Sequence, residues 1–329
     1  MITDMMTPFE LYQPSRVDDA LALLNRYDKD ARKLAGGNDS FDWFKDRIKR
    51  PRAVIDLNGI VELKGVRETS DGIEIGALTT LAEIARNPLI RQKYGLLADA
   101  ARKVGSPQIR NSGTLGGNVA QDTRCWYYRD GLLCHRAGGN TCYASRPTSM
   151  NREHAIFGAN RCMAVNASDT APALAALEAK MVIRNPQGER VVEAKDFFIG
   201  PSVDITRMTI LTPKDLLSAI RIPSKFANAQ FYFEKVSDRE AFDFALVNVA
   251  SAMIVKGGVI EQFSIACGGV ESVPRHLKVV EDVARGERQN DATAKLVGQA
   301  AVRGAAPLNY NQFKIVLMQN LVARAIRGA

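Results

Sequence analysis

The sequence has no long hydrophobic run and no export signal. None of its 329 residues lies in an apolar stretch of about 18, the length that a membrane-spanning helix needs, so we expect no membrane span. The first residues lack the basic start and the apolar core of an export signal. We therefore expect a cytoplasmic protein, with export to the periplasm beside a signal-bearing partner subunit as the alternative.

Concentrated basic runs and the familiar catalytic motifs are missing too. The formal net charge is +8, from 44 Lys and Arg against 36 Asp and Glu, but no five-residue basic run occurs, so we predict no nucleic-acid partner. The H-E-x-x-H zinc motif and the P-loop are absent, as is any candidate set of nucleophile, base and acid. We therefore assign no catalytic residue to this chain.

Cysteine is scarce, yet four of the five cysteines fall in one glycine- and arginine-rich stretch. The four are Cys125, Cys134, Cys142 and Cys162, and 8, 7 and 19 residues separate them in turn. These intervals contain no C-x-x-C pair of the kind that structural zinc sites use. A cuboidal iron–sulfur cluster needs four thiolates without fixed spacing, because a loop can wrap around it. We predict that the four cysteines ligate such a cluster; a zinc site and metal-free cysteines are the alternatives.

The neighbourhood of these cysteines is basic, whereas the fifth cysteine lies in an apolar run. The nearby arginines are Arg124, Arg129, Arg136, Arg146, Arg152 and Arg161. They can offset the negative charge of a cluster, dock an acidic partner protein or form a solvated basic loop. Cys267 follows alternating apolar residues, which predicts a buried strand position.

Two glycine turns point to a nucleotide. In residues 33–40 a predicted strand runs into Gly36-Gly37, and Thr114-Leu-Gly-Gly-Asn118 repeats the arrangement. Because glycine has no Cβ atom, backbone N–H groups there can approach a phosphate closely. Two such turns can enclose a pyrophosphate, which favours a dinucleotide, although a single Gly-Gly pair is also typical of an ordinary tight turn. Neither turn matches the Rossmann fingerprint or the P-loop.

The pattern of secondary structure changes near residue 224. Helices are predicted at 17–25, 80–85, 94–104 and 171–179, and strands at 31–35, 53–57, 72–76, 181–184, 190–193 and 216–222. Beyond this point strands are predicted at 230–236, 247–255 and 259–268, and helices at 278–285, 292–303 and 310–326. Thr80 and Glu83 form a capping-box pattern. The change predicts a domain boundary.

Three motifs in order resemble one known family. Leu34-Ala-Gly-Gly37, Asn111-Ser-Gly-Thr-Leu-Gly-Gly-Asn118 and Ser168-Asp169-Thr-Ala-Pro-Ala-Leu174 are similar to the FAD-binding (medium) subunit of the molybdenum hydroxylase family, which includes xanthine dehydrogenase. The resemblance covers essentially the whole chain. It implies an α+β fold: a two-part FAD-binding domain over 1–223, with a subdomain boundary near 60 and the cysteine loop at 122–165, and a smaller C-terminal α/β domain over 224–329.

The resemblance also implies a binding site for FAD. The residues that would hold the pyrophosphate are Lys33, Leu34, Ala35, Gly36, Gly37, Asn38, Asp39, Ser40, Thr114, Leu115, Gly116, Gly117 and Asn118. Asp169 would accept hydrogen bonds from ribityl or adenosine hydroxyls, while Val104 and Leu217 would pack on the cofactor. Lys235 would approach the isoalloxazine edge, where a cation raises the flavin potential. A helix-capping Asp169 and a surface Lys235 are the alternatives.

Most members of this family lack the cysteine loop. The loop is similar to two groups whose flavin subunits carry an extra 4Fe-4S cluster, the 4-hydroxybenzoyl-CoA reductases and the periplasmic-type aldehyde oxidoreductases. The stretches 123–128, 152–155 and 238–247 look closer to the aldehyde oxidoreductases. Within the loop we expect His154 to be a structural hydrogen-bonding residue, because four cysteines already suffice for a cluster.

The family resemblance implies that this chain is one part of a larger enzyme. A heterotrimer would contain a large molybdopterin subunit and a small subunit with two 2Fe-2S clusters, and electrons would pass through them to FAD. The acceptor would be a ferredoxin, a quinone or a cytochrome. Two alternatives remain: a 4-hydroxybenzoyl-CoA reductase-type subunit, with electrons flowing toward molybdenum, and a zinc-stabilised binding module without a redox function.

Overall fold

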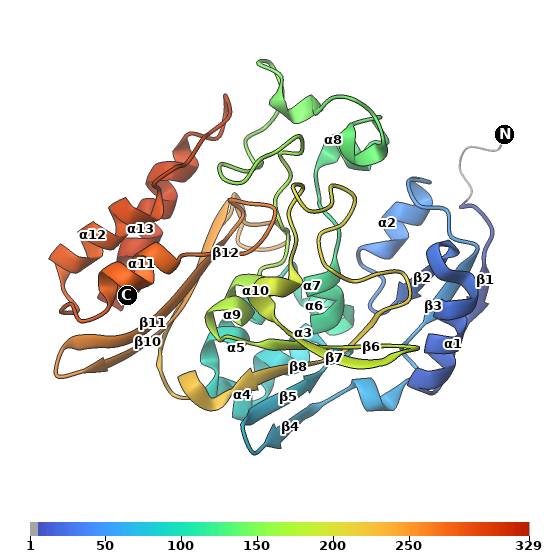
Figure 1. Ribbon diagram of the computed structural model, residues 1–329, viewed down its shortest axis with the longest axis horizontal. Helices are drawn as coiled ribbons and strands as arrows, with labels where there is room; N and C mark the ends of the chain where they lie inside the picture. Colours follow the sequence, from blue (N-terminus) through green and yellow to red (C-terminus); the bar gives the residue numbers. More distant parts are fainter. Residues whose placement is uncertain (1–5, 329) are drawn as a thin grey trace.

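The computed structural model describes residues 6–328, which fold around three β-sheets (Figure 1). The first sheet is parallel, in the order β1 (Glu10–Tyr12), β3 (Ala53–Asp56) and β2 (Ala31–Leu34). Helices α1 (Val17–Tyr27) and α2 (Ser40–Lys45) make the crossovers that parallel pairing requires. The apolar face of α1 is buried with Ile55 of β3 in one core cluster.

The second sheet is antiparallel and has five strands. Its order is β4 (Val66–Thr69), β5 (Gly72–Gly76), β8 (Leu216–Pro223), β6 (Lys180–Asn185) and β7 (Gly188–Glu193). The helices of this part are α3 (Leu81–Arg86), α4 (Pro88–Lys93), α5 (Gly95–Arg102), α6 (Pro107–Ser112), α7 (Leu115–Ala120), α9 (Thr170–Ala176) and α10 (Ala194–Phe197). Thr80 and Glu83 cap α3 reciprocally, which confirms the predicted capping box.

The third sheet is also antiparallel. It runs in the order β12 (Arg275–His276), β11 (Val259–Gly268), β10 (Val247–Lys256) and β9 (Gln230–Val236). Helices α11 (Lys278–Ala284), α12 (Asp291–Ala301) and α13 (Phe313–Arg327) pack on one of its faces. The three long strands confirm the sequence prediction, and Cys267 is fully buried in β11 as expected.

Helices fill the space between the second and third sheets. The largest core cluster joins Ile75 and Ile220 of the second sheet to Leu97 of α5, Leu174 of α9 and Ala250 of β10. Strand β10 is therefore covered on both faces, because alternate residues such as Val249 belong to the cluster under α13. These layers confirm the predicted α+β class.

The cysteine loop lies above the central part in Figure 1, beside the C-terminal helices. Its regular elements are short: α8 (Trp126–Arg129) and 3-10 turns at His135–Ala137 and Tyr143–Ser145. Further 3-10 turns lie at Asp28–Asp30, Val61–Leu63 and Ser224–Phe226. The far end of the loop is tied to the C-terminal part, because Ile156 donates to Val270 O at 2.9 Å. Between residues 6 and 328, no helix has the length and apolar character to cross a membrane.

Candidate functional site

The first glycine turn follows β2 and packs tightly against a distant segment. A Cβ atom on Gly36 would lie 2.2 Å from the carbonyl oxygen of Ser112, so no larger residue fits there. Gly37 has φ of +75°, a conformation that favours glycine. In the part of the chain that the structure describes, the amide N–H groups of residues 36–39 donate to no protein group. They form a small cradle suited to an anion.

The second predicted glycine turn is the start of a helix. Thr114 is the N-cap of α7, and its hydroxyl accepts from Gly117 N at 3.1 Å. The amides of Leu115 and Gly116 donate to Thr79 O and Ala77 O at 2.9 and 2.8 Å. The expectation that this segment offers its backbone amides to a pyrophosphate is therefore wrong for residues 115–118, because the fold already uses these four amides. Gly116 is required instead by packing, since its Cβ would lie 2.8 Å from Ala77 Cβ.

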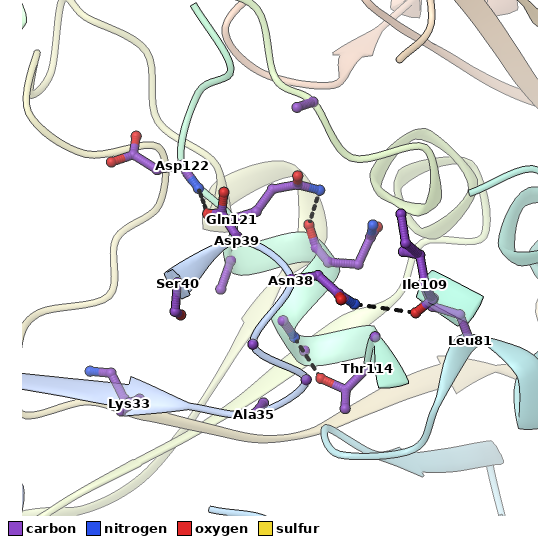
Figure 2. Close-up of a pocket in the computed structure, with 18 of the residues that line it drawn as sticks. Lys33, Ala35, Asn38, Asp39, Ser40, Leu81, Ile109, Thr114, Gln121 and Asp122 are labelled. Atoms are coloured by element: carbon purple, nitrogen blue, oxygen red, sulfur yellow. Dashed lines mark hydrogen bonds between the residues drawn. The ribbon is translucent and has the colours of Figure 1, made fainter. Parts of the chain in front are cut away.

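The two glycine segments line one cavity of about 350 Å³ (Figure 2). Fourteen of the seventeen predicted cofactor residues contribute to its wall: Lys33, Ala35, Gly36, Gly37, Asn38, Asp39, Ser40, Val104, Thr114, Gly116, Gly117, Asn118, Asp169 and Leu217. Asn38 reaches across it and donates to Ile109 O at 3.2 Å (Figure 2). The structure thus brings together segments that are up to 184 residues apart, from Lys33 to Leu217.

The other three predicted residues lie outside this wall. Leu115 is fully buried in the core, and Leu34 packs beside the buried Trp43 and Phe44. Lys235 lines neither this cavity nor the second one described below. Its ammonium group is instead buried against a carboxylate, so the surface-charge alternative for Lys235 is wrong.

Asp169 and Lys235 form a buried ion pair behind the cavity. Lys235 Nζ lies 2.6 Å from Asp169 Oδ2, and both side chains are 4% exposed. The ammonium also donates to Lys103 O and Asp243 O at 3.0 and 2.7 Å, which uses all three of its protons. Asn248 donates to the other carboxylate oxygen at 2.8 Å. Burial raises the pKa of Asp169, and the Lys235 charge opposes this shift.

Asp169 is positioned by its place before α9 but does not cap it. It is the N-cap residue by position, yet its side chain makes no capping hydrogen bond. The hydroxyls of Ser168 and Thr170 both donate to Asn118 Oδ1 at 2.6 Å. This contact fixes α7 against the start of α9, and it leaves the amide group of Asn118 as a donor on the cavity wall.

Several wall residues were not expected from the sequence. Leu81 and Ile109 add an apolar surface near the second segment, and Phe242 and Phe244 close the cavity from the C-terminal part. Phe242 has φ of +73° and its amide donates to Gly105 O at 3.0 Å. The left-handed backbone conformation of Phe242 could not be predicted from the sequence, because phenylalanine rarely adopts it and a long-range contact imposes it here.

A second cavity of about 610 Å³ joins the first to the cysteine loop. The two share Arg124, Ala167, Asp169 and the segment from Phe242 to Phe244. The second cavity also contains Cys125, so the nucleotide-sized first cavity and the cysteines are neighbours in space. This arrangement suits two redox groups that exchange electrons.

The four loop cysteines line one small pocket and form no disulfide. Cys125, Cys134, Cys142 and Cys162 meet there with Arg136. Burial raises the pKa of the Cys125 thiol to about 12, and the three neighbouring sulfurs add to the shift. Four thiolates can coexist here only if a bound cation offsets their charge. Within residues 6–328, no group of three or more His, Cys, Asp or Glu side chains is close enough to hold a single metal ion as the side chains stand.

Most of the loop arginines hold the loop in place. Arg124 and Arg129 both donate to Asp39 Oδ1, at 2.8 and 2.5 Å, which ties the loop to the first glycine turn. Arg136 is buried and pairs with Asp122 at 2.5 Å. Arg152 binds Asp238 through both carboxylate oxygens. The alternative of a merely solvated basic loop is therefore wrong for Arg124, Arg129 and Arg136, whereas Arg152 forms its ion pair on the exposed surface.

Comparison with known proteins places the chain in a family. Residues 7–225 match the model described as the FAD binding domain in molybdopterin dehydrogenase, and residues 232–329 match the CO dehydrogenase flavoprotein C-terminal domain. The chain is 31% identical to the aldehyde oxidoreductase FAD-binding subunit PaoB of Escherichia coli K12, over 91% of both chains. It is 29% identical to the carbon monoxide dehydrogenase medium chain of Hydrogenophaga pseudoflava, over 98% of this chain and 96% of that one.

A solved structure agrees with these sequence matches. The carbon monoxide dehydrogenase of Hydrogenophaga pseudoflava, in a form that lacks the Mo-pyranopterin moiety of its cofactor, superimposes with a TM-score of 0.79. The sequences are 26% identical, and the match covers 99% of this chain and 98% of the other.

Proposed function

The chain belongs to the FAD-binding subunits of the molybdenum hydroxylase family, and from this we propose that it is the flavin and iron–sulfur subunit of a heterotrimeric aldehyde oxidoreductase. A large molybdopterin subunit and a small subunit with two 2Fe-2S clusters complete the enzyme. Electrons from the substrate reach this chain through the small subunit and leave to a ferredoxin, quinone or cytochrome. We assign residues 1–223 to the FAD-binding domain and 224–329 to the C-terminal domain.

The cradle at residues 36–39 is the observation that supports the FAD site. Its free amides suit the pyrophosphate, and the amide group of Asn118 adds a donor from the opposite wall. Val104 and Leu217 supply apolar surface for the rings. Asp169 would accept from cofactor hydroxyls, and Lys235 holds its carboxylate in position. That Lys235 approaches the isoalloxazine edge stays a prediction. Bound FAD supplies the capacity to accept and release electrons at this site.

A 4Fe-4S cluster is the second part of the proposal. Four unpaired cysteines around one pocket fit the ligand set of such a cluster, and Arg136 beside them suits its negative charge. A bound cluster supplies one-electron transfer next to the flavin. A single zinc ion is the alternative for the same four cysteines, although their sequence contains no C-x-x-C pair of the kind that structural zinc sites use.

An aldehyde substrate is favoured by the match to PaoB and by residues 123–128, 152–155 and 238–247. The carbon monoxide dehydrogenase medium chain covers slightly more of this chain at similar identity. The proposal of an aldehyde substrate is therefore based on the cysteine loop rather than on overall sequence similarity. A 4-hydroxybenzoyl-CoA reductase-type subunit, with electrons moving toward molybdenum, is the alternative. We place the protein in the cytoplasm, with co-export beside a signal-bearing partner as the alternative.

The absorption spectrum and metal content of the purified chain test both cofactors. We expect a flavin band over a broad iron–sulfur shoulder, with about four irons per chain. Flavin without iron would remove the cluster and leave the family assignment intact. A colourless protein that contains only zinc would contradict the whole proposal.

The assembled enzyme tests the substrate and the direction of electron flow. Co-expression with the large and small subunits should give a complex that reduces an electron-accepting dye with aldehydes and not with carbon monoxide. A redox titration separates the alternative, because electron flow toward molybdenum needs a cluster potential well below that of the flavin.

A further inference from the structure

His154 lies within hydrogen-bond range of one loop cysteine. Its Nε2 atom is 3.3 Å from Cys125 Sγ, and the residue is 3% exposed. Among the described residues, no other side chain is placed to donate to any of the four sulfurs. We propose that His154 is a positioning residue that raises the reduction potential of the cluster by donating its Nε2–H to Cys125. This inference rests on the cluster proposed above.

The direction of the hydrogen bond follows from the chemistry of the pair. A thiolate bonded to iron carries no proton and can only accept, so Nε2 must carry the hydrogen. Nδ1 is then the acceptor nitrogen, and it has no partner within the described structure. Donors to a cluster sulfur stabilise the reduced, more negative state and raise its potential.

The backbone of His154 is fixed from the C-terminal part. Its carbonyl accepts from Lys314 Nζ and from Asn311 Nδ2, both at 3.0 Å. Its amide donates to Asn151 O at 3.1 Å, and the Tyr127 ring lies 6.2 Å from the imidazole, centroid to centroid. The imidazole therefore has little freedom to leave Cys125. Helix α13 thereby acts on the cluster environment from a different domain.

Three variants of the cofactor-loaded chain test the proposal. His154→Leu removes the donor, and His154→Gln keeps an N–H donor. His135→Leu is the matched control, because it removes an imidazole beside the same pocket that makes no hydrogen bond to sulfur. We expect His154→Leu to lower the midpoint potential of the cluster by about 59 mV, which corresponds to a tenfold change in the equilibrium constant of a one-electron reduction. His154→Gln and His135→Leu should titrate close to the unmodified protein.

Iron analysis of the same samples separates the possible failures. Four irons with an unchanged midpoint in His154→Leu would overturn the role of His154 and leave the cluster in place. An unmodified chain without iron would overturn the cluster and this inference together. If His154→Leu loses iron, pulsed EPR of the reduced unmodified protein and of reduced His154→Gln, both labelled with ¹⁵N-histidine, tests the hydrogen bond instead. A coupled imidazole nitrogen that disappears in His154→Gln supports the proposal, and its absence from the unmodified protein overturns it.

Discussion

At the scale of single residues, the least usual group is the buried Lys314. Its side chain has no solvent exposure and donates to two carbonyls, His154 O at 3.0 Å and Gly269 O at 2.6 Å. Among residues 6–328 no carboxylate forms an ion pair with it, and burial lowers the pKa of Lys314 to about 7. A neutral amine can still make both hydrogen bonds, because it keeps two protons.

This pKa predicts a stability that depends on pH. The pKa of this lysine is 10.5 in the unfolded chain and about 7 in the folded protein, so the unfolded chain takes up the proton more readily. The unfolded state therefore binds more protons between these values, and stability due to Lys314 rises with pH across this window, by at most about 1.4 kcal/mol per unit. Lys314→Met lacks this rise. Urea unfolding at pH 7, 8 and 9 should show that the unmodified protein gains stability relative to Lys314→Met as the pH rises; a constant difference between the two would contradict the assigned pKa.

Two cysteine substitutions separate ligand from core. Cys142→Ser should lose the cluster, disorder the loop and weaken FAD retention as a secondary effect, because thiolate–iron bonds then no longer hold the loop. Cys267→Ser should keep both cofactors and lose about 1–2 kcal/mol, the cost of burying a hydroxyl in β11. Iron and flavin contents of the two variants, measured side by side, check this. Full iron in Cys142→Ser, or its loss in Cys267→Ser, would show that the ligand assignment is wrong.

At the scale of elements, the first glycine turn and the cysteine loop share one carboxylate. Asp39 accepts from Arg124 and Arg129 through Oδ1, while Oδ2 accepts from Asp122 N and from Trp43 Nε1, both at 3.2 Å. The Arg129 guanidinium also lies 3.5 Å from the centroid of the Trp43 ring. Order in the loop and the shape of the phosphate cradle therefore depend on each other.

Asp39→Asn tests this dependence. The neutral amide keeps the size of the side chain but loses the charge that pairs with two arginines, so we expect about tenfold weaker FAD binding and faster proteolysis within the loop. Asp42→Asn is the matched control, because Asp42 is half exposed and contacts Arg124 only at 3.5 Å. Flavin titration and limited proteolysis of both variants measure the effects. Equal behaviour of the two would show that Asp39 does not couple the elements.

Helices, strands and loops that leave a local pattern in the sequence could be predicted, whereas the distant residues that they contact could not. The capping box of α3, the strands β9 to β11 and the crowding of four cysteines all leave periodic or compositional signals. Gly116 and Gly117 were predicted to form a turn, but they lie in the first turn of a helix. A Gly-Gly pair is compatible with both structures, and here the close packing of Gly116 on the distant Ala77 favours the helix. The Lys235 pair with Asp169 spans 66 residues and leaves no trace in either segment.

At the scale of the whole molecule, the first cavity is shared by all three parts of the fold. Lys33 lies in β2 of the first sheet and the cradle follows that strand, Leu217 lies in the second sheet, and Phe244 lies in the C-terminal part. The ion pair behind the cavity joins two of these parts, because Lys235 lies in β9 of the third sheet and Asp169 precedes α9, which packs with the second sheet. A ligand in this cavity therefore contacts every part and should stabilise the chain as one unit.

Thermal unfolding with different ligands tests this arrangement. At 100 times its dissociation constant, FAD should add about 2.7 kcal/mol to the stability of the flavin-free chain and raise Tm by a few degrees in a single transition. Riboflavin, which lacks the pyrophosphate, leaves the amides of residues 36–39 unpaired and should give a much smaller shift at the same concentration. Calorimetry of the flavin-free chain with each ligand supplies the measurement. An equal shift with riboflavin would show that the cradle does not bind the pyrophosphate, and an FAD-insensitive second transition would show that the C-terminal part unfolds independently.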